Sequence, residues 1–186
     1  SFHLIICEPT PDVLGQDLPA IVMDGYTSFK VFMTYENLRL SDPELLQTFD
    51  VARDLGATVM VHCENEDAIS FLVGKHEAAN NVRPAAHAST RPVTAEREAT
   101  HRAMSFAEIV DVPIVIVQHM PDEFITGFAR WLAKSTSLKV LIAHHDQVIN
   151  AGTIVIAPGN ANMAIIRKEH QLIAQLSTDT AQSRYM

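Results

Sequence analysis

The stretch "DVPIVIVQHMPDEFITGF", residues 111–128, decides the fold. Its apolar run, 113–117, has the length and the β-branched content of a buried strand, and the residues from Pro121 onward have the spacing of an amphipathic helix. A strand that leads straight into a helix indicates a βα unit, and α/β proteins bind ligands at the carboxyl ends of such strands. His119 lies just beyond this strand, which makes it the first candidate for a functional residue.

The composition is that of a folded domain that binds neither nucleic acid nor membrane. The chain has 186 residues, of which 47% are hydrophobic and 19% charged, enough for one domain with a core. A net charge of -8 without basic runs argues against a nucleic-acid binder, because phosphate contacts need clustered Lys and Arg. The apolar run at 3–7 is too short for a signal peptide or a membrane span. We expect a soluble, cytoplasmic protein, and the abrupt ends lead us to expect a piece cut from a longer sequence.

Strands and helices alternate through residue 143, which predicts a mostly parallel sheet with right-handed crossovers. Ser41 and Glu44 have the spacing of a capping box, and Gly56 has the position of a helix stop. After residue 143, short strands separated by turn residues predict a sheet extension and a C-terminal β-hairpin. We therefore expect a single-domain α/β fold with one parallel core. The predicted strands are 3–7, 28–33, 58–62, 113–117 and 139–143, and the predicted helices are 13–24, 41–56, 65–79, 94–110 and 121–135.

The first part of the chain carries three long motifs of one enzyme family. They are "DGYTSFKVFMTYENLRLSD", "GATVMVHCENEDAI" and "HASTRPVTAEREATHRA". Residues 1–117 resemble the dihydropyrimidinase/hydantoinase family of cyclic amidohydrolases, which are TIM barrels with two metal ions, usually zinc. The resemblance implies that Lys30 is the carbamylated lysine that bridges the metals and that His62 is a ligand of one of them. It also implies that Tyr35 hydrogen-bonds the substrate carbonyl and its developing oxyanion.

The second part carries motifs of a different family. They are "VQHMPDEFITGFARWLA", "GTIVIAPGNANM" and the final "SRYM". Residues 113–186 resemble the catalytic domain of the chemotaxis receptor glutamate methylesterase, a doubly wound α/β hydrolase with a Ser-His-Asp triad. The resemblance implies that His119 is the triad base.

Two resemblances in one chain predict a chimera with a joint near 113–119. The strand at 113–117 suits both families, and the residues after it belong to the esterase pattern. We expect one chimeric α/β domain over 1–186, made of a hydantoinase-like segment, 1–117, and a methylesterase-like segment, 118–186. Such a chain is expected to be an engineered or recombined product.

Each implied site is incomplete in this chain. The amidohydrolase metal centre needs a His-x-His pair, and the sequence contains none. Lys30 and His62 are therefore predicted to be vestigial ligands with no cofactor bound, the alternative being a partial zinc site. The esterase serine turn is replaced by "VHCENEDA", so His119 is predicted to be a vestigial base. Cys63 can stand in as nucleophile, with Glu64 beside it, or fill space as a small apolar group.

Three functions stay open at this point. The first is a scaffold without efficient catalysis, the second a weak hydrolase of esters or cyclic amides that uses Cys63 and His119 or a partial metal site, and the third a self-associating binding module. A barrel segment has no helices on its inner sheet face, so apolar side chains there stay uncovered. Either the tail folds over that face or a second copy covers it, and we expect a homo-oligomer.

Overall fold

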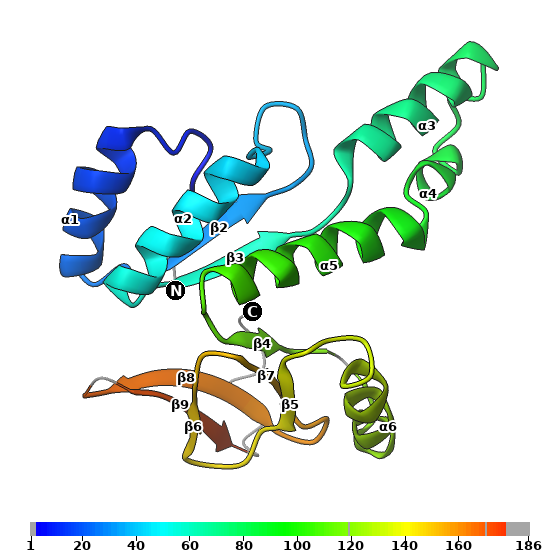
Figure 1. Ribbon diagram of the computed structural model, residues 1–186. Helices are drawn as coiled ribbons and strands as arrows, with labels where there is room; N and C mark the ends of the chain where they lie inside the picture. The colour runs from blue at the N-terminus through cyan, green and yellow to red at the C-terminus, as the bar shows by residue number, and fades with distance from the viewer. Residues whose placement is uncertain (1–2, 119, 170, 178–186) are drawn as a thin grey trace. The chain divides into compact units, whose positions relative to one another are not determined.

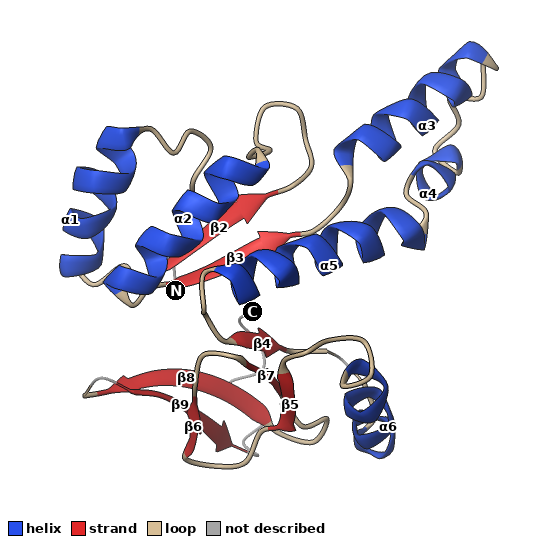
Figure 2. Cartoon of the chain, viewed as in Figure 1, coloured by secondary structure: helices blue, strands red, loops and turns tan. Residues whose placement is uncertain are grey.

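The chain folds into two compact units, Ser1–Val110 and Asp111–Met186. A computed structural model describes residues 3–118, 120–169 and 171–177 (Figures 1 and 2). Among these residues, no helix is both long and apolar enough to cross a membrane.

Unit 1 is a parallel sheet with helices. Its strand order is β1-β2-β3, and all neighbouring strands run parallel. The strands are β1 (Leu4–Ile5), β2 (Ser28–Phe32) and β3 (Thr58–His62), and the helical elements are the π-helical η1 (Val13–Asp17), α1 (Leu18–Met23), α2 (Asp42–Leu55), α3 (Glu66–Ala78), α4 (Ala86–Thr90) and α5 (Val93–Ile109).

The two faces of this sheet differ in burial. Phe29 and Val31 point to one face of β2 and are fully buried. Side chains alternate along a strand, so Lys30 and Phe32 point to the other face, where both are only half-buried. On that second face Ile5 of β1 is 53% exposed. One face of the sheet therefore packs into the core, and the other is incompletely covered.

Local signals account for the best-predicted elements. Helix α2 begins after Ser41, whose backbone N–H donates to Glu44 Oε2 at 2.7 Å, and it ends at Gly56 with φ of 66°. Its buried positions include Leu45 and Phe49, as the helical spacing predicts. The capping box and the glycine stop are confirmed.

Unit 2 contains two further sheets and one long helix. The parallel sheet has the order β4-β7-β5, and the antiparallel sheet has the order β6-β9-β8. Ile154, Val155 and Ile156 of the central strand β7 are fully buried. Val155 packs with Ala143, Ile149 and Ala174 in one apolar cluster. The elements are β4 (Ile114–Ile116), α6 (Asp122–Leu132), β5 (Lys139–Ile142), β6 (Gln147–Ile149), β7 (Thr153–Ile156), β8 (Asn162–Lys168) and β9 (Gln171–Ser177).

The expected α/β fold, with mostly parallel sheets from βα units and a C-terminal hairpin of β8 and β9, is confirmed. The expectation of one parallel core is wrong, because the parallel strands form two separate three-stranded sheets. Strand β7 enters the second sheet between β4 and β5, and sequence order does not reveal such an insertion. Whether the two units fold cooperatively as one domain stays a prediction, because compactness does not measure cooperativity.

Gly159 fixes the connection between β4 and α6. A Cβ at this position would lie 2.4 Å from Met120 O and 2.8 Å from Asp122 N, which are backbone atoms that cannot rotate away. Gly159 N also donates to Asp122 Oδ1 at 3.2 Å. Gly159, in the turn that follows β7, therefore holds the start of α6 by backbone approach and by a hydrogen bond.

We predict that Gly159→Ala destabilises unit 2 by about 1–3 kcal/mol, the usual range for overpacking. The measurement is urea unfolding followed by far-ultraviolet circular dichroism, which reports on the helices and strands of both units. Gly74→Ala is the matched control, because Gly74 lies in α3 with nothing within 4 Å of an added Cβ. That control is expected to be neutral or stabilising by up to about 1 kcal/mol. Equal stability of Gly159→Ala and wild type would contradict the packing described here.

Candidate functional site

The carboxyl ends of β2 and β3 bring the predicted amidohydrolase residues together. Phe32 pairs in register with His62, and Tyr35 lies in the loop that follows β2. The ring centroids of Phe32 and Tyr35 both lie 5.5 Å from that of His62, and Lys30 Nζ lies 5.3 Å from the Phe32 centroid. The structure thus gathers Lys30, His62 and Tyr35 around one aromatic side chain, although they are distant in sequence.

His62 has a partner within the protein. Its Nε2 donates to Glu64 Oε2 at 2.9 Å, and Glu64 Oε1 lies 4.0 Å from Arg91 Nε. A nitrogen that carries a proton in such a bond has no lone pair for a metal. Zinc coordination through Nε2 would therefore require the His62–Glu64 bond to break.

The described residues do not bring the predicted metal ligands, Lys30 and His62, into a cluster of metal-binding side chains. Within residues 3–118, 120–169 and 171–177, no three His, Cys, Asp or Glu side chains converge in a way that could hold a metal ion. Lys30 Nζ lies over the Phe32 ring in a cation–π contact. The donor set described here does not fit the dinuclear centre that the sequence resemblance implies.

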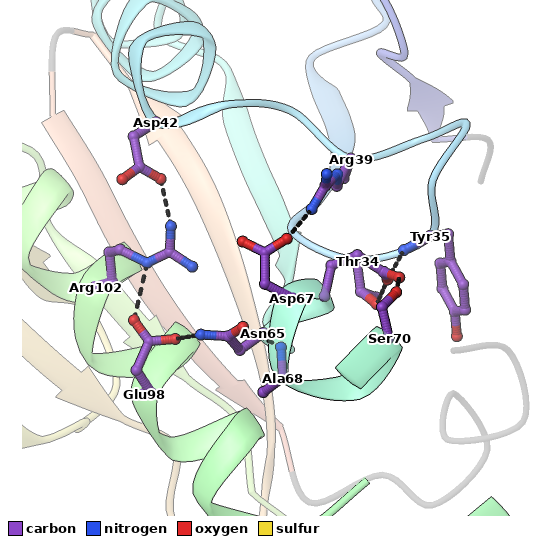
Figure 3. A network of polar contacts seen from close by, with 11 residues as sticks. Thr34, Tyr35, Arg39, Asp42, Asn65, Asp67, Ala68, Ser70, Glu98 and Arg102 are labelled. Atoms are coloured by element: carbon purple, nitrogen blue, oxygen red, sulfur yellow. Dashed lines mark hydrogen bonds and ion pairs between the residues drawn. The ribbon is translucent and has the colours of Figure 1, made fainter. Parts of the chain in front are cut away.

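Tyr35 is positioned by a carboxylate that is not among the predicted site residues. Glu66 Oε2 accepts hydrogen bonds from Thr34 Oγ1 at 2.6 Å and from Tyr35 N at 2.7 Å, and Glu66 Oε1 accepts from Ser70 Oγ at 2.7 Å. Thr34 is fully buried, and Tyr35 has a φ of 70°, which is uncommon for a residue other than glycine. Glu66, in the first turn of α3, therefore holds the beginning of the β2–α2 loop against this helix. Thr34, Tyr35 and Ser70, which it joins, lie close together in Figure 3.

Arg102 extends the network to two further helices. It is an α5 residue that forms an ion pair with Asp42 at the start of α2, and its Nε lies 3.1 Å from Glu98 Oε1. Asn65 Nδ2 donates to Glu98 Oε2 at 2.6 Å (Figure 3). Helices α2, α3 and α5 are thus tied together at the same end of the sheet.

A polar cleft of about 420 Å³ opens beside this network. Its carboxylates are paired: Glu44 with Ser41, Asp67 with Arg39 at 2.8 Å, and the others as described above. Because these side chains form hydrogen bonds and ion pairs with one another, we interpret the cleft as part of the structural network. The cleft is lined by Met33, Arg39, Leu40, Ser41, Asp42, Glu44, Asn65, Glu66, Asp67 and Arg102.

Cys63 lies in a setting that keeps its thiol protonated. Burial raises the pKa of Cys63 to about 11, and this outweighs the opposing effects of a hydrogen bond with Thr100 and of the Lys30 charge. The thiolate is the nucleophilic form of cysteine, so the thiol is a weak nucleophile near neutral pH. His119 lies outside the described residues, and the Cys63–His119 pair stays a prediction.

Unit 2 has its own cleft at the carboxyl ends of β5 and β7, with a volume of about 690 Å³. His145 lies at this edge, and its Nδ1 is 3.0 Å from Leu176 O and 3.1 Å from Leu176 N. The ring thereby joins the end of β5 to β9, which the sequence pattern did not reveal. The cleft is lined by Ala143, His144, His145, Pro158, Asn160, Ala161, Leu176 and Ser177.

Comparisons with known proteins find two families. The family model of CheB methylesterase matches residues 97–185. A D-hydantoinase of Ralstonia pickettii is 41% identical over 142 residues, which are 76% of this chain and 30% of that protein. A D-hydantoinase of Rhizobium radiobacter is 44% identical over 118 residues, which are 63% of this chain and 26% of that protein. A solved structure of D-hydantoinase matches with a TM-score of 0.63 and 38% identity, over 76% of this chain and 31% of the other.

Both resemblances predicted from the sequence are confirmed, and they overlap. A match over 142 of the 186 residues has to reach residue 142 or beyond, whereas the methylesterase match begins at 97. The stretch shared by the two matches therefore includes β4, α6, β5 and all of α5 except its first four residues. The chain spans no more than about a third of the length of these D-hydantoinases.

We predict that Glu66→Ala destabilises unit 1 by about 1–3 kcal/mol, because it leaves the buried Thr34 hydroxyl and Tyr35 N–H without their acceptor. Burial raises the pKa of Glu66, but the bonds from Thr34, Ser70 and Tyr35 N together with Arg39 lower it further, so the net shift is downward. A carboxyl with a lowered folded-state pKa contributes stability above its unfolded value of about 4.3 and loses it as the pH falls through the folded value. The measurement is urea unfolding as a function of pH.

Glu66→Gln is the matched control for this carboxylate. Its amide oxygen can accept from Thr34 and Tyr35 N while its NH2 faces Ser70, so most of the neutral-pH stability is expected to remain. The acid-dependent part is expected to vanish, since the side chain no longer titrates. Identical acid dependence in wild type and Glu66→Gln would show that Glu66 does not act in this way.

We predict that Cys63 reacts slowly with thiol reagents at neutral pH and that its labelling rate rises with a midpoint near the pKa of about 11. The measurement uses the variant Cys7→Ser, which removes the other, exposed cysteine. The reciprocal variant, Cys63→Ser, reports the labelling of Cys7 and is expected to react faster. A Cys63 that labels rapidly at neutral pH would instead be an activated nucleophile.

Proposed function

We propose that this chain is a recombined α/β fusion that does not efficiently catalyse either reaction of its two related families. A hydantoinase-like segment and a methylesterase-like segment are present in one chain of 186 residues. The proposal concerns only the 186 residues of this sequence, since the D-hydantoinases that it matches are much longer.

The observation that carries the proposal is the state of His62. Its Nε2 is bonded to Glu64, and Lys30 faces the ring of Phe32. Two-metal hydrolysis needs ligands that converge on the metal ions with free lone pairs. The side chains at the carboxyl ends of β2 and β3 instead contact one another, which favours a structural role for them.

A weak hydrolase is the second candidate. Cys63 as nucleophile and His119 as base would resemble the Cys–His pairs of other hydrolases. The pKa of about 11 for Cys63 opposes this role, because the thiol stays protonated unless a base removes its proton. Hydrolysis of a protein glutamate methyl ester or of a cyclic amide by this pair is therefore expected to be slow.

Self-association is the third element of the proposal. The incompletely covered face of β1 to β3 carries Ile5 at 53% exposure, and unit 2 exposes large aromatic side chains on α6. Apolar surface of this kind favours contact with another copy. We infer that the chain acts as a homo-oligomeric scaffold.

We predict that the purified chain hydrolyses hydantoin and protein glutamate methyl esters no faster than the Cys63→Ala/His119→Ala/His62→Ala variant does, with or without added zinc. The reason is that the variant removes groups that are not organised for catalysis. The assay follows ring opening by ultraviolet absorbance and methanol release from the ester. Turnover well above the variant would refute the proposal, and the single substitution that abolishes it would identify the responsible group.

A further inference from the structure

Helix α6 is apolar on two faces. Ile125 and Leu132 are 1% and 7% exposed and pack into unit 2. Phe124 and Trp131 on the same helix are 60% and 61% exposed. The buried face accounts for the folding of the helix against its own unit, and the exposed face requires a separate explanation.

Three aromatic residues form one stripe, which consists of the exposed Phe124 and Trp131 and the half-buried Phe128. Their spacing of four and three residues places them on one side of the helix. The rings of Phe128 and Trp131 stack with centroids 6.1 Å apart. Gly127 lies beside them with nothing within 4 Å of an added Cβ, which leaves room for another backbone to approach. The stripe has the features of a helix-packing surface without its partner among the described residues.

One flank of the stripe carries charges of opposite sign at its two ends. Glu123 stands in the first turn and Arg130 in the last turn, and both are exposed. Seven residues separate them, close to two turns of 3.6 residues, so both lie on the same flank. Asp122 at the start of α6 is already engaged by Gly159 N.

We propose that a second copy of this chain docks on the aromatic stripe, with the two α6 helices antiparallel. In an antiparallel pair related by a two-fold axis, a given flank of one helix faces the same flank of the other. Glu123 of each copy then lies opposite the other copy's arginine at position 130. The opposed helix dipoles add to this preference, because each positive end lies beside a negative end.

The charge pattern selects a second copy over an unrelated partner. It is self-complementary in the antiparallel sense and has no such match in a parallel pair, where the flank would face the opposite side of the partner. Helix α6 has 11 residues and is about 16 Å long, so the contact is smaller than a standard interface. The dimer is therefore expected to depend on concentration. This inference rests on the proposed self-association and adds the surface that performs it.

The experiment is sedimentation equilibrium of the full chain over about a hundredfold range of concentration, because dimerisation follows mass action. Trp131→Gln is expected to weaken the dimer at least about tenfold. Trp131→Phe, which keeps an aromatic ring, is expected to have a small effect. Because residue 131 is exposed, thermal unfolding of both variants is expected to match wild type.

A charge exchange tests the orientation of the helices. Glu123→Arg alone and Arg130→Glu alone each place like charges opposite one another and are expected to weaken the dimer several-fold. The double variant Glu123→Arg/Arg130→Glu restores opposite charges across an antiparallel pair and is expected to regain most of the affinity. No restoration in the double variant would overturn the antiparallel arrangement.

The outcomes separate this surface from self-association in general. A wild-type chain that is monomeric at every concentration would refute both. A dimer that Trp131→Gln leaves intact would refute the aromatic stripe as the interface, while self-association through another surface would stand. Loss of the dimer in Trp131→Gln, together with restoration in the charge exchange, supports the proposed pair.

Discussion

The hydrogen bonds of the Glu66 carboxylate are the interaction on which the structure at the carboxyl ends of β2 and β3 depends. It accepts three hydrogen bonds of 2.6 to 2.7 Å from two different segments, one of them from the fully buried Thr34. Hydrogen bonds to a charged group contribute more than neutral ones, and we expect these bonds to account for the about 1–3 kcal/mol lost in Glu66→Ala. This energy offsets the uncommon left-handed backbone of Tyr35 and gives the loop after β2 a defined path.

The same edge shows why family likeness and chemistry can separate. Lys30, His62 and Tyr35 lie together because β2 and β3 are adjacent parallel strands, and that adjacency needs only local βα folding. A catalytic centre needs more, because its ligands have to converge with free lone pairs. The partners found here, Glu64 for His62 and the Phe32 ring for Lys30, belong to a self-sufficient structure. The resemblance to D-hydantoinases thus extends to the placement of these residues, and the loss of their chemistry is what we propose.

Much of the fold could be predicted from the sequence because its signals are local. Helix α2 follows from Ser41, Glu44 and Gly56, and strand β3 agrees with its predicted bounds of 58–62. Features that depend on distant residues could not be predicted. The insertion of β7 between β4 and β5 follows from competition among strands for one sheet position, which no local pattern encodes.

The candidate site divides in the same way. Lys30, His62, Tyr35 and Cys63 could be named from motifs, whereas the role of Glu66 could not. Glu66 stands at the start of α3 and meets a loop about thirty residues away, so its sequence position suggests only a favourable charge at a helix N-terminus. The pKa of Cys63 likewise depends on burial, which a motif does not report.

The central claim is that His62 and Lys30, at the carboxyl ends of β2 and β3, have partners within the protein in place of metal ions. The most direct measurement is the nitrogen NMR spectrum of the His62 ring during a zinc titration. The account predicts that the Nε2–H···Glu64 bond persists when zinc is in moderate excess, so the ring nitrogen shifts stay unchanged. A saturable shift of the His62 ring at stoichiometric zinc, with a matching change at Lys30, would show that these residues form a metal site and would contradict the account.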